Sequence, residues 1–442
     1  MLAALAILGL AASVQLSNTH LPLDTNGAAL FTGEAGGGDT VQLQYQEAAE
    51  LELAPRGGLP CTSNLDCSLN GVCSKETAMC ICDAPWKDSA KEACSVLDVL
   101  PHPNGYVPAY GGGATRRSTS WEKQSITSWG GNIVRGEDQK YHMFVSTMDE
   151  GKGLGSWGTQ SRIDHAIADD PMDRFAFVST ALPKEAHNAS PLKYEANGSY
   201  VIFHVGAANG TGGASTFAHF SDSVDGPWHA LGNSLANCNN PAPVFLSNGS
   251  TLVLCSVGGY ALYHTSDLFH GNGWTKSLDL TLPPSWSQPM PYGHGKAYED
   301  PFLWQDARGN LHMLHHLYDF RNGFPLDPAA PHPLQVSAHA FSAPPFLEWH
   351  YNIDAQPYDP RITFENGTVQ NFSTWERPHL LFDPKTRTPT HLINGVQSYY
   401  NGPRGACDGC KKSGGSNHSC AGCKSTIGLD YTYTLVTKLN VL

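Results

Sequence analysis

A two-part pattern that recurs from about residue 100 onward constrains the fold of this 442-residue chain more than any other feature. Its first part is a polar pair, a proline or small residue, an apolar strand, a tight turn and a second apolar strand. Four segments carry it: HNASPLKYEANGSYVIFHVG, NNPAPVFLSNGSTLVLCSVGG, YEDPFLWQDARGNLHMLHH and ERPHLLFDPKTRTPTHLINGV. A fifth, GGNIVRGEDQKYHMFVST, precedes them without the proline. The Asn-Gly turns at Asn197 and Asn248 predict hairpins, because the favoured two-residue turn needs positive φ at both positions.

The second part of the pattern lies between these segments and reads as an alternating strand, a turn and an aromatic-led strand. It appears as SRIDHAIADDPMDRF, ASTFAHFSDSVDGPWHAL, YALYHTSDLFHGNGWTKSL and VSAHAFSAPPFLEWHYN. Two successive hairpins make a four-stranded sheet, and a unit that returns every ~50 to 80 residues is typical of propeller blades. The pattern therefore predicts an all-β fold with a five-bladed β-propeller over residues 105–442, in which YTYTLVTKLN completes the last blade. A β-sandwich is the alternative, but it would not explain the recurrence.

Composition and charge exclude some partners. The net charge is -13, from 27 basic and 40 acidic side chains, and the chain has no basic run. Nucleic acid and anionic membranes are therefore poor partners. Charged residues make up only 15% of the chain, against 45 glycines and 30 prolines, which favours β-structure with many tight turns.

The first residues and the cysteine content indicate export. Residues 1–14 have a short apolar segment that ends near small residues, as a secretory signal peptide does, although a buried helix is the alternative. It is too short to span a bilayer, so we expect a secreted, extracellular protein without a membrane span. Residues 15–60 are interpreted as a low-complexity linker. Twelve cysteines favour an oxidising compartment, and seven glycosylation sequons fit a glycoprotein: Asn188, Asn197, Asn209, Asn248, Asn366, Asn371 and Asn417.

Residues 61–94 hold six cysteines in about thirty residues, too few to bury a core, so crosslinks must replace one. Spacing alone leaves fifteen connectivities open. The segment resembles an epidermal-growth-factor-like module over its whole length. The resemblance implies the disulfides Cys61–Cys73, Cys67–Cys80 and Cys82–Cys94, and we expect a spacer or a module that docks a protein partner.

The remaining cysteines fall into two groups. Cys238 and Cys255 flank the hairpin of the third repeat and are predicted to staple it. Cys407, Cys410, Cys420 and Cys423 form paired Cys-x-x-Cys knuckles, which hold zinc in many proteins. Because their interval is shorter than in zinc ribbons and the compartment is oxidising, we expect disulfides there instead.

The histidines of LHMLHH do not predict a metal site. On a strand, His312 and His316 share a face but lie about 13 Å apart, and His315 points to the other face. They cannot jointly chelate one ion as a helical pair would. We interpret them as ordinary strand residues and expect no cofactor, with a structural calcium ion in the propeller channel as the alternative.

Aligning the repeats on their proline predicts a polar ring, because the innermost strands of all blades start at the same end of the channel. The pairs before the proline or its equivalent are His187 and Asn188, Asn239 and Asn240, Glu299 and Asp300, and Glu376 and Arg377. Gly131 and Asn132 are the expected pair of the first blade. Alternation allows only one residue of each pair to point fully inward.

Glu299-Asp300-Pro301 and Glu376-Arg377-Pro378-His379 resemble the signatures of five-bladed propeller glycoside hydrolases, family 43 and its furanosidase relatives. The stretch from Ser221 to Trp228 is similar to a blade turn of that family. The resemblance implies hydrolysis of glycosidic bonds, with Glu376 as general acid and Asp300 tuning its pKa, or Glu299 in place of Asp300. The structural alternative is that these carboxylates cap strand ends or pair with Arg377.

The sequence departs from that family at the catalytic base. The family has an aspartate in an early blade, whereas this chain offers Asn132, Asn188 and Asn240, and asparagine cannot take a proton near neutral pH. Three explanations stay open: a loop carboxylate reaches in, the substrate assists itself, or the protein binds glycan without cleaving it. The candidate loop carboxylates are Asp149, Glu150 and Asp164.

Other ring residues are candidates for contacting an oligo- or polysaccharide. The expected substrate-binding set is Asn132, His187, Asn188, Asn240, Arg377, His294, Trp129 and Trp375, with Trp121, Trp157 and Tyr292 also near the ring. Packing is the alternative for each aromatic residue. A glycan on Asn188 would block the channel mouth, so we expect that sequon to be unmodified. The leading prediction is a secreted glycoside hydrolase; the alternatives are a non-catalytic glycan-binding propeller and an interaction protein that uses the cysteine-rich module.

Overall fold

The computed structural model describes residues 57–111, 126–148, 153–206, 215–256, 259–270, 273–286, 298–318, 335–398 and 432–442. The predicted signal peptide, most of the predicted linker and the four cysteines from Cys407 to Cys423 lie outside these residues. Within them, no helix is long and apolar enough to cross a membrane.

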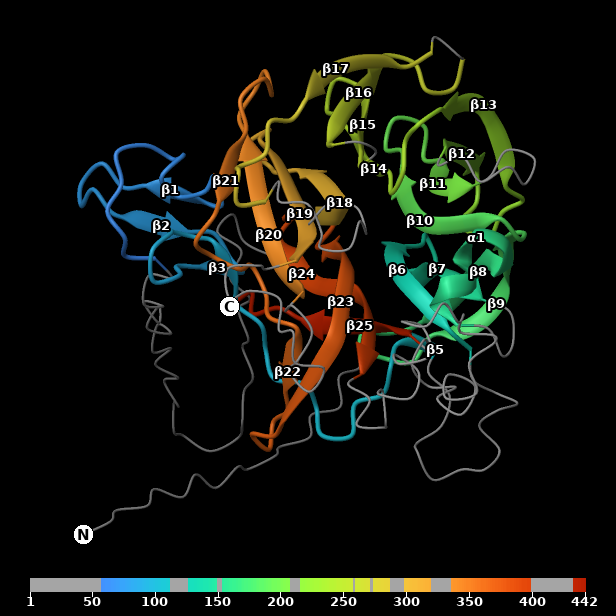
Figure 1. Cartoon of the computed structure of the whole chain (residues 1–442), viewed down its shortest axis with the longest axis horizontal. Coiled ribbons are helices and arrows are strands. Elements are labelled where there is room, and N and C mark those ends of the chain that lie inside the picture. The colour runs from blue at the N-terminus through green and yellow to red at the C-terminus, as the bar shows by residue number, and fades with distance from the viewer. Residues whose placement is uncertain are drawn as a thin grey trace, which may run out of the picture. The chain divides into compact units, whose positions relative to one another are not determined.

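Five antiparallel sheets form the blades of a propeller, as the repeat predicted. In each of the first four, the strands are hydrogen-bonded in chain order. Blade 1 contains β6 (Ser128–Arg135), β7 (Tyr141–Met148), β8 (Ser161–Ala168) and β9 (Ala176–Leu182). Blade 2 contains β10 (Ala186–Lys193), β11 (Tyr200–Gly206), β12 (Ser215–Ser221) and β13 (His229–Leu235). Blade 3 contains β14 (Ala242–Phe245), β15 (Thr251–Cys255), β16 (Ala261–Thr265) and β17 (Thr275–Asp279), and blade 4 contains β18 (Tyr298–Gln305), β19 (Leu311–Tyr318), β20 (Gln335–Ser342) and β21 (His350–Asn352). Figure 1 shows β6, β10, β14, β18 and β23 next to a common centre.

The fifth blade joins the two ends of the propeller. Its strands are β22 (Arg361–Thr363), β23 (Val369–Phe382), β24 (Pro389–Ser398), β25 (Tyr433–Lys438) and β5 (Tyr110–Gly111), in that order. The C-terminal strand β25 takes the place predicted for it, while β5 comes from before the first blade and pairs with β25. This pairing closes the ring.

A short 3-10 turn, η2 (Leu154–Ser156), and α1 (Trp157–Gln160) precede β8.

Apolar side chains pack between neighbouring blades. Between blades 3 and 4, for example, Leu254 and Tyr260 meet Leu303 and Met313, and all four are buried. Each such side chain stabilises the fold by about 1.5–3 kcal/mol relative to exposure. The inner strands are buried on both faces, which explains their continuous apolar runs, whereas the outer strand β9 is largely exposed.

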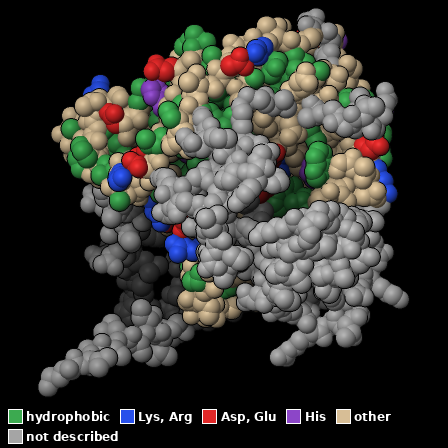
Figure 2. All heavy atoms as spheres, in the orientation of Figure 1, with side chains coloured by type: hydrophobic (Ala, Val, Ile, Leu, Met, Phe, Trp, Pro, Cys, Tyr) green, Lys and Arg blue, Asp and Glu red, His purple; other side chains and the backbone are tan. Residues whose placement is uncertain are grey.

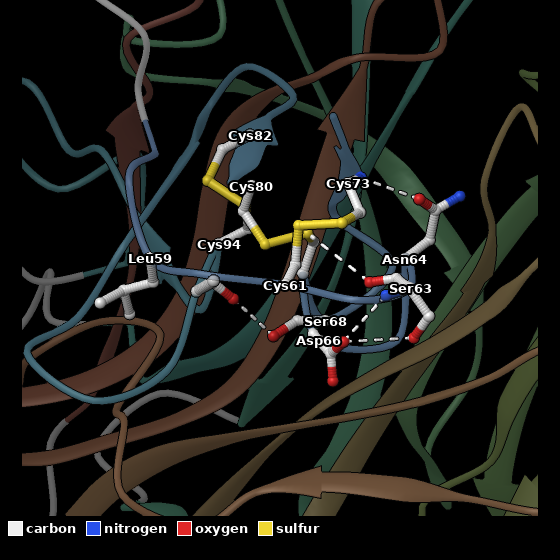
Figure 3. The surroundings of a disulfide bond; sticks show 12 residues. Leu59, Cys61, Ser63, Asn64, Asp66, Ser68, Cys73, Cys80, Cys82 and Cys94 are labelled. Atoms are coloured by element: carbon white, nitrogen blue, oxygen red, sulfur yellow. Dashed lines mark hydrogen bonds between the residues drawn. A yellow bond between two sulfur atoms is a disulfide. The ribbon is translucent and has the colours of Figure 1, made fainter. Parts of the chain in front are cut away.

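The cysteine-rich segment folds into two small hairpins, β1 (Gly71–Cys73) with β2 (Cys80–Cys82), and β3 (Trp86–Lys87) with β4 (Val96–Leu97). Its disulfides join Cys61 to Cys73, Cys67 to Cys80, and Cys82 to Cys94, the pairing implied by the resemblance (Figure 3). The predicted staple between Cys238 and Cys255 is also present. Gly71 is needed here because a Cβ would approach the carbonyl oxygen of Ile81 to 2.5 Å.

Polar contacts hold this disulfide module against blade 4. The Arg308 guanidinium, from the β18–β19 turn, donates to the carbonyl oxygen of Leu69 at 2.6 Å and to the Asp83 carboxylate. Glu92 of the module accepts hydrogen bonds from the backbone N–H of Ile353 and of Asp354 at 2.9 and 3.2 Å. The module is therefore docked on the propeller.

Replacing Arg308 by methionine should weaken this docking. A charged hydrogen bond to a carbonyl and a half-exposed ion pair are lost, so we expect the free energy of unfolding to fall by about 1–2 kcal/mol. Chemical denaturation followed by tryptophan fluorescence measures the change. Arg361→Met is the matched control, because Arg361 pairs only with exposed Asp359 two residues away. Equal effects of the two substitutions would contradict docking through Arg308.

Candidate functional site

One backbone feature recurs where the inner strand of each blade begins. Gly130, Asn188, Asn240, Asp300 and Arg377 all have left-handed conformations, with φ of 54, 59, 47, 54 and 52°. In blades 1, 2, 4 and 5 a β-bulge lies at this point. A bulge changes the direction in which the following side chain points, and bulges are frequent beside functional sites. The five residues are thus equivalent positions of one ring.

These left-handed positions confirm the residue pairs predicted for blades 2 to 5, whereas the pair predicted for blade 1 is wrong. There the equivalent pair is Trp129 and Gly130, and not Gly131 and Asn132. Asn132 lies beyond the bulge, where it is buried and its side-chain oxygen accepts a hydrogen bond from the backbone N–H of Ile133. Blade 1 has Gly131 where blades 3 to 5 have the proline that anchors the alignment, which explains the shift of two residues.

Gly130 makes room for a cation. A Cβ at this position would lie 2.8 Å from the Cβ, Cδ and Nε atoms of Arg377. The guanidinium lies against this glycine and donates from Nη1 to Asp300 Oδ1 at 3.0 Å, joining blades 4 and 5. Both side chains are almost fully buried, at 1% and 5% exposure. A buried ion pair of this kind must form as a unit.

His316 is the second cation of the site. Its Nδ1 lies 3.5 Å from Asp300 Oδ2, and ligand atoms of Asp300, His316 and Glu376 all lie within 4.8 Å of one another. Burial opposes the charge on His316, but the carboxylates of Glu376, Asp300 and Glu299 outweigh it and raise its pKa to about 9. The pKa of Asp300 falls to about 2, because Arg377 and His316 outweigh its burial.

The interpretation of His316 as an ordinary strand residue is therefore wrong. His316 lies directly opposite Glu299 in the β18–β19 pair, one residue before the bulge. Its place opposite a ring residue was the available signal. The neighbouring His315 is buried against Trp286 and Tyr260 and has a structural role. Asp300, His316 and Glu376 fit calcium poorly, since calcium takes six to eight oxygen ligands and Arg377 already neutralises Asp300.

A chain of amides leads from blade 2 to Glu299. Asn188 Nδ2 donates to Asn240 Oδ1, and Asn240 Nδ2 donates to Glu299 Oε1 at 2.8 Å. Burial and the charges of Asp300 and Glu376 raise the pKa of Glu299 to about 7, against the opposing effects of His316 and Asn240. Adjacent carboxyl groups thus differ: Asp300 is a fixed anion, while Glu299 holds a proton up to neutral pH.

Asn188 is buried and its amide nitrogen is engaged, which leaves no room for a glycan and agrees with the expectation for that sequon. The sequon asparagines Asn197, Asn248 and Asn366 lie exposed in hairpin turns. Asp164 is not a ring residue: it is buried in blade 1 and accepts hydrogen bonds from Arg162 at 2.8 Å and from the Tyr110 hydroxyl at 3.2 Å. It is therefore not the missing base.

The aromatic candidates divide into packed and exposed residues. Trp129 of blade 1 lies against Gly395 of blade 5, and Trp375 lies 5.0 Å from the Phe372 ring. Both tryptophans are buried, so Trp129 packs between two blades and Trp375 packs within blade 5. Trp157 is 44% exposed and stacks on His187, with ring centroids 5.2 Å apart. His187 in turn bonds the Ser161 hydroxyl at 2.8 Å. The remaining candidates lie outside the described residues: Trp121, Tyr292, His294, Asp149 and Glu150.

On the face shown in Figure 2, basic side chains of the described residues are scattered singly among acidic, polar and apolar ones. No basic patch of the kind that binds nucleic acid is visible on the described part of this face.

The sequence matches no protein-family profile and no curated protein. Among solved structures, the catalytic domain of the Coprinopsis cinerea GH62 alpha-L-arabinofuranosidase is 10% identical, with a TM-score of 0.48 over 78% of this chain and 98% of that one. The endo-arabinase of Bacteroides thetaiotaomicron is 13% identical, with a TM-score of 0.44 over 72% and 95% of the two chains. A family 117 glycoside hydrolase of Zobellia galactanivorans is 9% identical, with a TM-score of 0.42 over 78% and 90%. Likenesses this remote carry no information about activity.

The Arg377–Asp300 pair predicts strongly non-additive mutant effects. Arg377→Met leaves the Asp300 carboxylate with one fewer cation and should lower the free energy of unfolding by about 3–5 kcal/mol. Adding Asp300→Asn removes the uncompensated charge, so the double variant should be more stable than Arg377→Met alone. A double-mutant cycle by denaturant unfolding measures this coupling. Additive effects would show that the two charges do not depend on each other.

Proposed function

We propose that the protein is a secreted carbohydrate-active propeller that hydrolyses glycosidic bonds at its central ring. One observation carries the proposal: burial and neighbouring charges raise the pKa of Glu299 to about 7, while the adjacent Asp300, which has a carboxylate oxygen within 4.8 Å of one of Glu376, stays ionised. Glycoside hydrolysis needs one carboxyl group that can donate a proton and one that is ionised. The predicted signal peptide, the paired cysteines and the sequons support secretion.

In the proposed reaction Glu299 is the general acid. It donates its proton to the leaving oxygen as the bond to the anomeric carbon breaks, and water supplies a hydroxyl group to that carbon. The proton of this water passes to Glu376. The resemblance assigned the acid role to Glu376, but the raised pKa of Glu299 and the positive charge of His316 beside Glu376 favour the reversed assignment.

Asp300, Arg377 and His316 act on this pair without taking part in bond making. The fixed negative charge of Asp300 is one cause of the raised pKa of Glu299. Arg377, from the neighbouring blade 5, holds Asp300 ionised. The exposed Trp157 ring, supported by His187, is the described aromatic surface best suited to pack against a sugar.

Glycan binding without hydrolysis is the second candidate function. The observation in its favour is that Asn188 and Asn240 occupy ring positions equivalent to Asp300 and hydrogen-bond to each other and to Glu299. The ring residues of blades 1 to 3 therefore offer amides, a glycine and aromatic groups but no carboxylate. A substrate screen on the secreted protein separates the two functions.

Glu299→Gln and Glu376→Gln should each lower kcat by about 10²–10⁴-fold, because each removes a proton-transfer group. The assay is a screen of aryl furanosides, aryl pyranosides and algal or plant polysaccharides. Glu365→Gln is the control, since Glu365 is an exposed glutamate away from the ring. Undiminished turnover in Glu299→Gln would refute its acid role. Glycan binding by wild-type protein, with no turnover of any substrate, would favour the second function.

The pH profile tests the acid independently. Glu299 acts in its protonated form, which is fully populated well below its pKa of about 7 and declines tenfold per pH unit above it. We therefore expect kcat/KM to fall on the basic side of about pH 7. This basic limb should disappear from the residual activity of Glu299→Gln. A basic limb that persists in that variant would assign the proton to another group.

A further inference from the structure

Two blades contain the same buried chain of hydrogen-bonded histidines, outside the ring. In blade 4, Asp306 of the β18–β19 turn contacts His312 of β19 at 3.4 Å, and His312 bonds His339 of β20 at 3.2 Å. The chain ends at Asn352 of β21, whose Nδ2 lies 3.1 Å from His339 Nδ1. Both histidines are buried.

Blade 1 repeats this chain at equivalent positions but ends it differently. Asp138 Oδ1 of the β6–β7 turn lies 3.1 Å from His142 Nε2, and His142 Nδ1 lies 2.8 Å from His165 Nε2. No asparagine follows. His165 Nδ1 is buried without a hydrogen-bond partner and faces the Asp225 carboxylate of the β12–β13 turn in blade 2, at 3.9 Å.

The direction of the hydrogen bonds fixes the free end of the chain. An ionised Asp138 only accepts, so a neutral His142 donates from Nε2 and accepts at Nδ1. His165 then donates from Nε2, and its Nδ1 carries a lone pair, because a buried imidazole is normally neutral. In blade 4 the Asn352 amide N–H satisfies the corresponding lone pair. In blade 1 the lone pair of His165 faces a carboxylate oxygen, so two acceptors face each other.

We propose that His165 and Asp225 bind a divalent transition-metal ion, with zinc as the best match, between blades 1 and 2. Imidazole nitrogen and carboxylate oxygen are zinc ligands. Atoms about 2.1 Å from one tetrahedral ion lie roughly 3.4 Å apart, so Asp225 must move by only about half an ångström. Its side chain is 65% exposed on a turn, and water completes the coordination.

His142 and Asp138 are the supporting residues of this site. A metal-binding histidine normally donates its other N–H to a carboxylate or another acceptor, which fixes the ring and its protonation. Here the donation runs from His165 through His142 to Asp138. One ligand atom each of His142, His165 and Asp225 lies within 4.8 Å of the others, which places the supporting histidine directly behind the ligands. The bound ion would crosslink two blades.

Zinc chloride titrated into chelator-treated, full-length protein tests the site by calorimetry, with bound zinc counted by elemental analysis after dialysis. We expect Asp225→Asn to bind one zinc ion fewer, or to bind it at least tenfold more weakly. Asp222→Asn, on the same turn, is the matched control and should bind as wild type. Asp225→His keeps a ligand and should retain the ion. Asp138→Asn should weaken binding by about 10–100-fold, although Asp138 never touches the metal.

These substitutions lie at exposed or half-exposed positions, so loss of folding does not confound them. None of these variants alters Asp300, His316 or Glu376. Any zinc bound by those three residues is therefore the same in every variant and does not affect the comparison. Equal zinc stoichiometry and affinity in wild type and Asp225→Asn would overturn the proposal. So would loss of binding in Asp222→Asn to the same extent as in Asp225→Asn.

Discussion

The buried ion pair between Arg377 and Asp300 is the interaction on which the rest of the ring depends. An isolated charge in this interior would cost several kcal/mol, so neither group is stable there alone. The pair can form because Gly130, in the neighbouring blade 1, leaves space for the guanidinium. Three blades thus contribute to this ion pair. Blade 4 supplies the Asp300 carboxylate, blade 5 supplies the Arg377 guanidinium, and blade 1 leaves space for it because Gly130 has no side chain.

The ion pair also explains how neighbouring carboxyl groups come to differ. Asp300 is held between Arg377 and His316 and stays ionised, while Glu299, one residue earlier, points toward the Asn240 amide and lies near two negative charges. Backbone direction separates them, since the left-handed Asp300 follows Glu299 at the bulge. The backbone conformation at the bulge therefore gives Glu299 and Asp300 different surroundings and hence different pKa values. Acid–base chemistry at neutral pH requires such a difference between two carboxyl groups.

Much of the fold was predictable from the sequence because the hairpin repeat is local information. The polar pair and the proline or small residue after it identified the ring in blades 2 to 5. The Asn-Gly turns marked two hairpins, although positive φ is found only at Gly198 and Gly249 and not at the asparagines before them. The first blade was misaligned because glycine replaces the proline there. His316 was missed because alternation gives only the face on which a histidine lies, whereas the register of the hairpin is what puts it opposite Glu299. The role of Gly130 was beyond prediction, since its only sign is an arginine almost 250 residues away.

The closure of the ring by β5 has a consequence for how the chain reaches its native state. The strand at Tyr110–Gly111 leaves the ribosome before the first blade, yet its partner β25 is made only after the other strands of all five blades. During synthesis, four complete blades precede the one that joins the ends. Until the C-terminal residues emerge, the edges of the fifth sheet stay unpaired, and such edges are templates for aggregation. A truncated chain would therefore retain most of its hairpins and still lack a closed ring.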